Sequence, residues 1–132
     1  MHVEYTIEDR ERSRVGPSVT IPSGIESLCS GCFEGCTKLS EIRIPESVTT
    51  IGDNCFSYCW ALTGVTLPSA VSRVPDQCFR YCGSLESIAL PSSIREIGHE
   101  SFLECTELRD IRLYDADISI GTLIEEGRLR CE

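Results

Sequence analysis

Phenylalanine recurs every 23 residues through most of this 132-residue chain. The four phenylalanines are Phe33, Phe56, Phe79 and Phe102. Seven further columns keep the same spacing, one each of proline, cysteine and leucine and four that are aliphatic. These columns begin at Pro22, Cys36, Leu39, Val19, Ile21, Ile25 and Leu28. One register shared by so many columns predicts a solenoid of stacked repeats, in which each coil buries its apolar side chains against its neighbours.

The repeat from Leu39 to Cys59 shows what one coil contains. The alternation of Ile42 and Ile44 predicts a short strand with one buried face. Pro45 cannot donate to a strand ladder, so it ends that strand. Asp53 is placed to cap a short turn of helix, and Phe56 would fill the centre of the coil. Equivalent strands of stacked coils then lie side by side at about 4.8 Å and form a parallel sheet.

Gly52 and Gly98 raise the question of a positive backbone dihedral angle, which glycine adopts readily. The same column holds Cys29 and Pro75 in the other repeats, and proline forbids that conformation. We therefore expect glycine to be convenient at this position and not required.

The repeat resembles the BspA-like class of leucine-rich repeats, whose unit reads approximately L-x-x-I-x-I-P-x-x-V-x-x-I-G-x-x-A-F-x-x-C. The match runs from Val19 to Leu113, about three quarters of the chain. Cysteine or serine stands where that family usually has alanine, at Cys32, Cys55, Cys78 and Ser101. The resemblance implies an α/β repeat solenoid, a right-handed coil with short parallel strands on one face and short helical or 3-10 turns. It also implies a surface adhesin or interaction protein that binds other proteins, without catalysis or cofactor.

We predict a single leucine-rich-repeat domain over residues 1–132. Its parts are an N-terminal flank or cap at 1–17, regular repeats at 18–113 and a degenerate terminal repeat at 114–132. The terminal repeat departs from the pattern because its outer face would meet water. The departures are Tyr114 in the proline column, Glu125 in the phenylalanine column and Arg128 in the cysteine column, and Cys131 is expected to be frayed.

The N-terminal flank holds one further pattern. Val3, Tyr5 and Ile7 alternate with polar residues. This alternation predicts an edge strand that covers the first repeat.

The formal charge of −9 and the pI near 4.7 constrain the partner. Nucleic acid and anionic membranes attract basic surfaces, so a basic or neutral protein is the expected partner. No apolar stretch is long enough for a signal peptide or a membrane span. The sequence as written therefore suggests a cytoplasmic protein, or a cell-surface protein if it is a piece of a longer family member. The oligomeric state is not predicted.

Nine cysteines leave three interpretations open. The pairs Cys32/Cys36, Cys55/Cys59 and Cys78/Cys82 share the repeat period, which spreads them along the stack, whereas a structural zinc site gathers four ligands at one point. Neighbouring ladder cysteines would be close enough for disulfides but would point the same way. Buried thiols acting as small apolar side chains are the favoured interpretation. A cysteine-based redox- or metal-responsive protein is the alternative function.

No catalytic arrangement stands out in the sequence. His2 and His99 have no cysteine or serine partner in a comparable column, so a nucleophile with its general base is not predicted. The carboxylates fall at outward positions, where perturbed acid/base pairs are not expected. We therefore predict a protein that is not an enzyme and that needs no cofactor or metal.

Two sets of outward residues are candidates for protein binding. The first lies on the strand face, and leucine-rich solenoids generally present such a face to ligands. The second combines the aromatic and arginine residues that are enriched in interface hot spots, although these side chains could also merely cover the cysteine ladder. The first set is Glu41, Arg43, Thr66, Asp110 and Arg112, and the second is Tyr58, Trp60, Arg80 and Tyr81.

Overall fold

The computed structural model describes residues 3–13, 15–114, 125 and 130–131. Eleven short strands and one helix occur among these residues, and each of the middle coils contributes two strands. In chain order they are β1 (Glu4–Tyr5), α1 (Ile7–Ser13), β2 (Ser18–Thr20), β3 (Ser27–Leu28), β4 (Glu41–Arg43), β5 (Thr50–Ile51), β6 (Gly64–Thr66), β7 (Arg73–Val74), β8 (Ser87–Leu90), β9 (Glu96–Ile97), β10 (Asp110–Leu113) and β11 (Arg130–Cys131).

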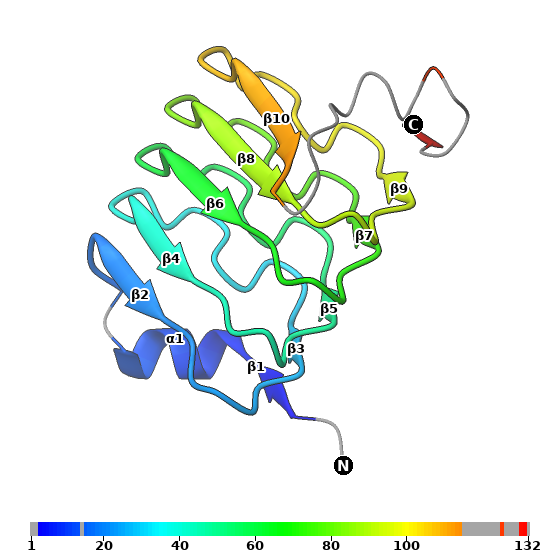
Figure 1. Cartoon of the computed structure of the whole chain (residues 1–132). Helices are drawn as coiled ribbons and strands as arrows, with labels where there is room; N and C mark the ends of the chain where they lie inside the picture. Colours follow the sequence, from blue (N-terminus) through cyan, green and yellow to red (C-terminus); the bar gives the residue numbers. More distant parts are fainter. Residues whose placement is uncertain (1–2, 14, 115–124, 126–129, 132) are drawn as a thin grey trace.

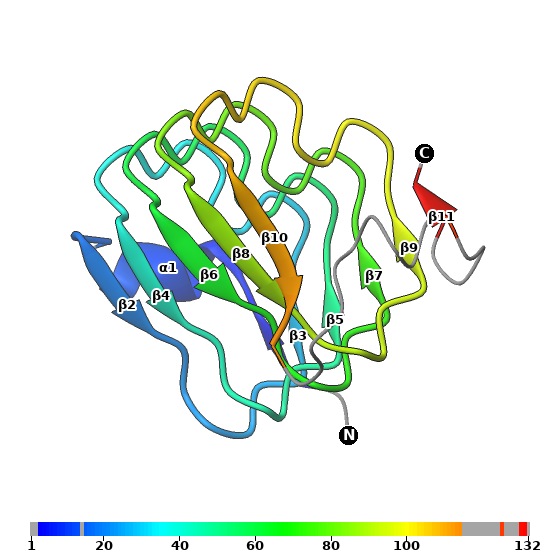
Figure 2. The ribbon, with the colours of Figure 1, turned by 45° about the horizontal axis from the view of Figure 1, so that its top comes forward.

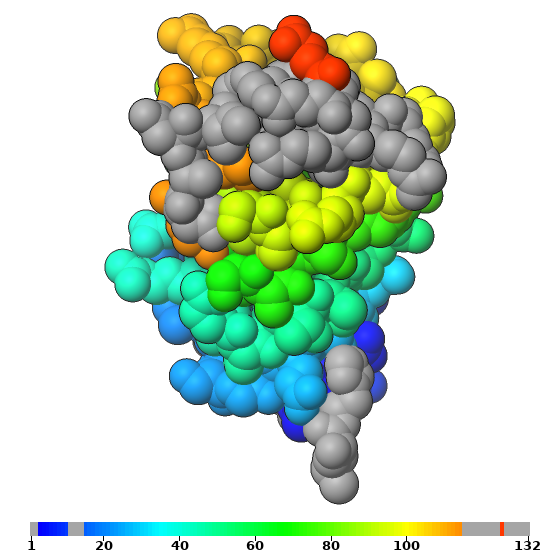
Figure 3. Space-filling view, turned by 45° about the vertical axis from the view of Figure 1, so that its right-hand side comes forward, coloured from blue at the N-terminus to red at the C-terminus, as the bar shows by residue number. Residues whose placement is uncertain are grey.

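The strands form two parallel series on different sides of the coil (Figures 1 and 2). One series runs β2, β4, β6, β8 and β10, in which β2 pairs with β4 and β8 pairs with both β6 and β10. The other consists of the sheets β1-β3-β5 and β7-β9-β11. Consecutive coils appear as successive colour bands in Figure 3. The predicted solenoid of short parallel strands is therefore confirmed, and helix contributes little, because the segments between the strands are turns.

The phenylalanine column forms one continuous stack inside the coils. Ring centroids are 5.7 Å apart between Phe33 and Phe56, 5.4 Å between Phe56 and Phe79, and 5.6 Å between Phe79 and Phe102. Interplanar angles of 2° to 6° make the rings nearly parallel. The first three rings are completely buried. The 23-residue period is thus the period of the core itself.

The N-terminal flank closes the first coil. β1 pairs with β3, and the Tyr5 ring continues the aromatic stack at 5.6 Å from Phe33. The chain then turns into α1, where the Thr6 hydroxyl and the Asp9 carboxylate bond to each other's backbone N–H groups as a capping box. The predicted edge strand is correct for Tyr5. It is wrong for Ile7, which begins the helix and is 45% exposed.

Each turn segment contains two positions with left-handed backbone, four residues apart. Glycine occupies both positions in the first coil, at Gly31 (φ 63°) and Gly35 (φ 74°). The later coils place non-glycine residues there, at Asn54, Tyr58, Gln77, Tyr81, Glu100 and Glu104. Left-handed conformation disfavours side chains with a Cβ, so the repeat geometry overrides local preference at these positions.

The expectation that glycine is convenient but not required at Gly52 and Gly98 is wrong. Neither residue has a positive φ angle, but a Cβ added to Gly52 would lie 2.4 Å from the backbone nitrogen of Ser30. A Cβ on Gly98 would lie 2.7 Å from the backbone nitrogen of Asp76. Glycine is therefore required at both places, because the backbone of the preceding coil comes too close for any side chain.

Asp53 also differs from its expected role. Its carboxylate accepts the N–H of Asp76 in the next coil at 3.1 Å and does not cap its own turn. Asp76 repeats the arrangement by accepting the N–H of His99 at 2.8 Å, and this bond lowers the pKa of Asp76. These aspartates therefore join neighbouring coils.

The C-terminal end departs from the 23-residue register. β11 pairs with β9, and Cys131 lies opposite Ile97, 34 residues earlier in the sequence. The expectation of a frayed Cys131 is therefore wrong, because Cys131 lies in β11 and pairs with Ile97. The expectation for Arg128 concerns a residue outside the described part of the chain.

Candidate functional site

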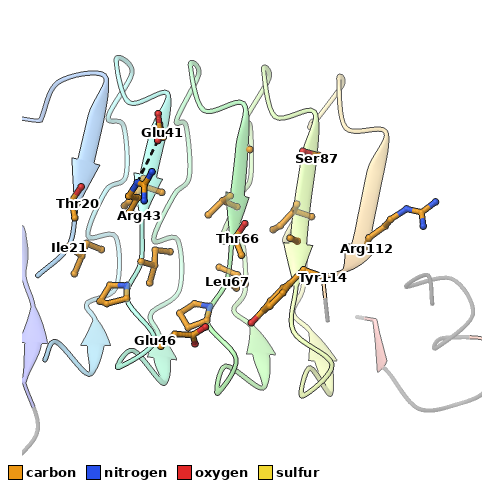
Figure 4. Close-up of a pocket in the computed structure, with 18 of the residues that line it drawn as sticks. Thr20, Ile21, Glu41, Arg43, Glu46, Thr66, Leu67, Ser87, Arg112 and Tyr114 are labelled. Carbon is orange, nitrogen blue, oxygen red and sulfur yellow. Dashed lines mark ion pairs between the residues drawn. The ribbon is translucent and has the colours of Figure 1, made fainter. Parts of the chain in front are cut away.

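A shallow open groove of about 940 Å³ lies along the outward face of β4, β6, β8 and β10 (Figure 4). Alternation along the strands creates this face: Ile42, Val65 and Ile88 point into the core, and their neighbours point outward. The groove spans five coils, because Thr20 of β2 also lines it. It is therefore a surface that no single repeat could form.

Two outward columns make up this face. Strand register places Glu41, Gly64, Ser87 and Asp110 in one column and Arg43, Thr66, Ala89 and Arg112 in the other. All five strand residues predicted as binding candidates, Glu41, Arg43, Thr66, Asp110 and Arg112, line the groove. The structure thus brings the first candidate set together on one surface.

Charge in the groove is concentrated on two strands, β4 and β10. On β4, Arg43 Nε lies 3.9 Å from Glu41 Oε1, and on β10, Arg112 Nε lies 2.9 Å from Asp110 Oδ1. Figure 4 shows the Arg112 side chain directed away from the strands, beyond β10. All four side chains are more than half exposed, so these ion pairs contribute little to stability and their charges face solvent.

One wall of the groove was not foreseen from the sequence. Tyr114 and Glu46 line the groove where the strands end, and Figure 4 shows Tyr114 lying across the strand ends toward Leu67. The Glu46 carboxylate accepts bonds from the backbone N–H and the hydroxyl of Ser69, at 2.8 and 2.9 Å. The only sequence signal for Tyr114 was its presence in the proline column.

The second candidate set also forms a contiguous cluster, outside the groove lining. The Tyr58 and Tyr81 rings stack with centroids 5.0 Å apart, and Trp60 meets them edge-on at 6.0 and 6.5 Å. Trp60 is 47% exposed. Both tyrosines occupy left-handed backbone positions, a constraint that the sequence did not reveal.

Arg80 packs on the edge of this aromatic cluster. Its guanidinium carbon lies 5.2 Å from the Tyr81 ring centroid and 5.9 Å from that of Tyr58. Its Nη1 donates to Gln77 Oε1 at 3.4 Å, whereas its buried Nε has no hydrogen-bond partner among the described residues. The guanidinium is thus held mainly by the two rings, as in a cation–π contact.

The cysteine columns lie in the core as thiols. Cys59 and Cys82 are completely buried, and their Sγ–H groups donate to the Phe33 and Phe56 carbonyl oxygens at 3.2 and 3.0 Å. Burial raises the pKa of Cys59 and raises that of Cys82 to about 12. These thiols therefore remain protonated at neutral pH and act as small apolar residues with one weak donor.

The histidine, cysteine and carboxylate side chains of the described residues do not gather into a metal site. No group of three or more histidine, cysteine, aspartate or glutamate side chains is arranged there to hold a metal ion. His99 is 66% exposed, with its Nε2 3.7 Å from Glu100 Oε2.

Solved structures of bacterial leucine-rich repeat proteins resemble this fold. A leucine-rich cell surface protein from Faecalibacterium prausnitzii matches with 25% identity and a TM-score of 0.66, over 76% of this chain and 33% of that one. A leucine-rich repeat protein from Bacteroides ovatus matches with 29% identity and a TM-score of 0.62, over 71% and 30%. A Treponema pallidum leucine-rich repeat protein matches with 25% identity and a TM-score of 0.70, over 85% and 59%.

This chain thus spans between about a third and three fifths of the length of those proteins. A comparison with curated protein sequences finds no match. Among the described residues, no helix has the length and apolar character needed to cross a bilayer.

A sequence comparison with protein families also gives a match. The pattern described as "BspA type Leucine rich repeat region" recurs in six copies over residues 16–124. These residues include all the coils that contribute strands to the groove and the whole phenylalanine stack. The chain belongs to the BspA-type leucine-rich repeat family.

Proposed function

We propose that this protein is a non-enzymatic protein-interaction module that binds its partner in the groove over β4, β6, β8 and β10. The observation that carries the proposal is the groove itself, an open hollow of about 940 Å³ lined by residues of five coils. The buried columns are explained by packing. The groove residues vary from coil to coil, which suits recognition of one particular partner surface.

The chemistry of the groove supports a protein ligand. Its floor combines exposed hydroxyl, carboxylate and guanidinium groups with small side chains. Such groups can satisfy the charged side chains and hydrogen-bonding groups of a polypeptide. The net charge of −9 favours a basic or neutral partner.

The proposal has two more specific forms. One is an adhesin-like role at a cell surface, and the other is a role as an intracellular scaffold. One structural relative is described as a cell surface protein, which supports the first. Both roles use the same groove.

The aromatic cluster of Tyr58, Trp60, Arg80 and Tyr81 is proposed as a second contact for the same partner. Trp60 leaves nearly half of its surface exposed although it packs edge-on against both tyrosines. Aromatic and arginine side chains of this kind are enriched among the residues that dominate binding energy.

Site-specific photo-crosslinking tests the groove proposal. A benzophenone amino acid is placed at Thr66 in the groove and, as a matched control, at Ser72, which is exposed and does not line it. Both variants are exposed to cell extract and to extracellular-matrix proteins. A partner captured from Thr66 is then produced in pure form for direct binding measurements.

The expected result is a partner captured from position 66 and not from position 72. Its affinity should fall at least about tenfold with Thr66→Trp, which fills the groove, and remain unchanged with Ser72→Trp. Equal capture from both positions, or equal affinity of the two tryptophan variants, would refute binding in the groove.

A further inference from the structure

The groove carries charged side chains on β4 and β10 with small side chains between them, and this arrangement restricts the shape of its ligand. The Glu41/Arg43 pair on β4 and the Asp110/Arg112 pair on β10 bracket β6 and β8. Three strand steps separate the two pairs, a distance of about 14 Å at about 4.8 Å per step. A ligand that meets both pairs must therefore run across the strands, along the axis of the solenoid.

The floor between the charged ends consists of Gly64, Thr66, Ser87 and Ala89. None of these side chains reaches far above the sheet, so the groove is deepest over β6 and β8. A bulky apolar ligand side chain fits this part of the groove.

An extended segment matches these dimensions better than a helix does. Extended chain advances about 3.4 Å per residue, so four residues cover about 14 Å, and residues i, i+2 and i+4 face the same side. A helix is about 10 Å wide. On β4 and on β10 the two columns are separated by two residues along the strand, about 7 Å, so the long side chains there leave little room for a helix between them.

The two ends differ in the charge they offer. At the β4 end, Arg43 is 78% exposed and lies 3.9 Å from Glu41, so its guanidinium is available to a ligand carboxylate. At the β10 end, Arg112 Nε donates to Asp110 Oδ1 at 2.9 Å and the Arg112 side chain extends beyond β10 (Figure 4), so a basic ligand group would meet Asp110 through its other carboxylate oxygen, Oδ2. The groove thus complements a ligand with an acidic side chain at one end and a basic one at the other.

We propose that the groove recognises an extended polypeptide segment with oppositely charged side chains at positions i and i+4 and a bulky apolar side chain at i+2. The inference rests on the proposed function, because it specifies the ligand of the same groove. The acidic side chain lies over Arg43, the apolar one over Gly64 and Ala89, and the basic one over Asp110.

A random nine-residue peptide library displayed on phage tests this inference. The library is panned against the wild-type protein and, in parallel, against the exchange variant Glu41→Arg/Arg43→Glu. The exchange preserves composition and net charge and lies on an exposed surface, so circular dichroism and Tm should match the wild type. Thr66→Trp serves as a filled-groove control.

The expected peptides carry opposite charges four residues apart around an apolar residue, and the exchange variant should not retain them. In a synthetic peptide of this kind, one inserted glycine that lengthens the spacing to i+5 should weaken binding at least about tenfold. Peptides that bind the groove without this spacing would overturn the inference and leave the proposed function standing. Peptides that bind Thr66→Trp as tightly as the wild type would overturn both.

Discussion

Individual side chains in this protein divide between two roles according to the column they occupy. Phe56 is completely buried between two parallel rings, whereas Trp60, four residues later, is 47% exposed. Cys59, between them in sequence, is buried and donates a weak hydrogen bond to the preceding coil. A shift of one or a few residues therefore separates a buried position from an exposed one.

Phe56→Ala and Trp60→Ala should differ sharply in stability. The first opens a cavity in the aromatic stack and should lower the free energy of unfolding by about 3–5 kcal/mol. The second removes edge-on contacts at the surface and should cost less than about 1.5 kcal/mol. Urea unfolding of both variants measures the difference. Equal losses would contradict the placement of Trp60 outside the core.

Alkaline pH should destabilise the protein through its buried thiols. Burial raises the pKa of Cys82 in the folded state to about 12, above the ordinary value of 9.0. Below pH 9 the thiol is protonated in both states, so its contribution to stability is fully present. Between pH 9 and about 12 the thiol ionises in the unfolded state but not in the folded state. Over this range the free energy of unfolding therefore falls by about 1 kcal/mol per pH unit.

Cys82→Ser is the matched variant for this prediction, because serine retains a donor for the Phe56 carbonyl but does not titrate in this range. The free energy of unfolding, measured in urea from pH 7 to 10.5, should fall less steeply in the variant than in the wild type. Identical slopes would show that the Cys82 thiol is not protected from ionisation.

At the scale of the coil, the close approach of neighbouring turns is as important as the apolar columns. Gly52 lies against Cys29 and Ser30 of the preceding coil, and Gly98 lies against Pro75 and Asp76 in the same way. A glycine in every second coil therefore allows the backbone to approach its neighbour closely.

Gly52→Ala should be destabilising by about 1–3 kcal/mol, because the new Cβ would overlap the backbone of Ser30 and force the coils apart. Gly83→Ala is the control. Its Cβ would meet the Trp60 ring at 3.6 Å, an ordinary contact, so it should change stability by less than about 0.5 kcal/mol. Thermal unfolding compares the two, and a Gly52→Ala variant as stable as Gly83→Ala would contradict the close-approach explanation.

The strands and the core could be predicted from the sequence because they follow from periodic apolar columns. The requirement for Gly52 could not, because it depends on the distance between two backbones in different coils. The left-handed backbone at Tyr58 and Tyr81 could not be predicted from the sequence for a related reason. No local preference of tyrosine indicates that conformation, and the stacked coils impose it.

At the scale of the whole molecule, the 23-residue period places the outward residues of successive strands side by side, so the strand face is continuous over the coils. The five strand-face candidates were predictable because alternation fixes which residues point outward, and all five line the groove. The contribution of Tyr114 was not predictable, because its direction depends on how the chain leaves β10 (Figure 4). The return of β11 to β9 was missed because its spacing differs from 23 residues.

The most direct test is an NMR titration of the isotopically labelled protein with its captured partner or a selected peptide. Recognition in the groove predicts the largest amide shift changes at Gly64, Thr66, Ser87 and Ala89, with smaller changes at the ends of the groove. Changes confined to Tyr58, Trp60 and Tyr81, with the groove amides unmoved, would contradict the account.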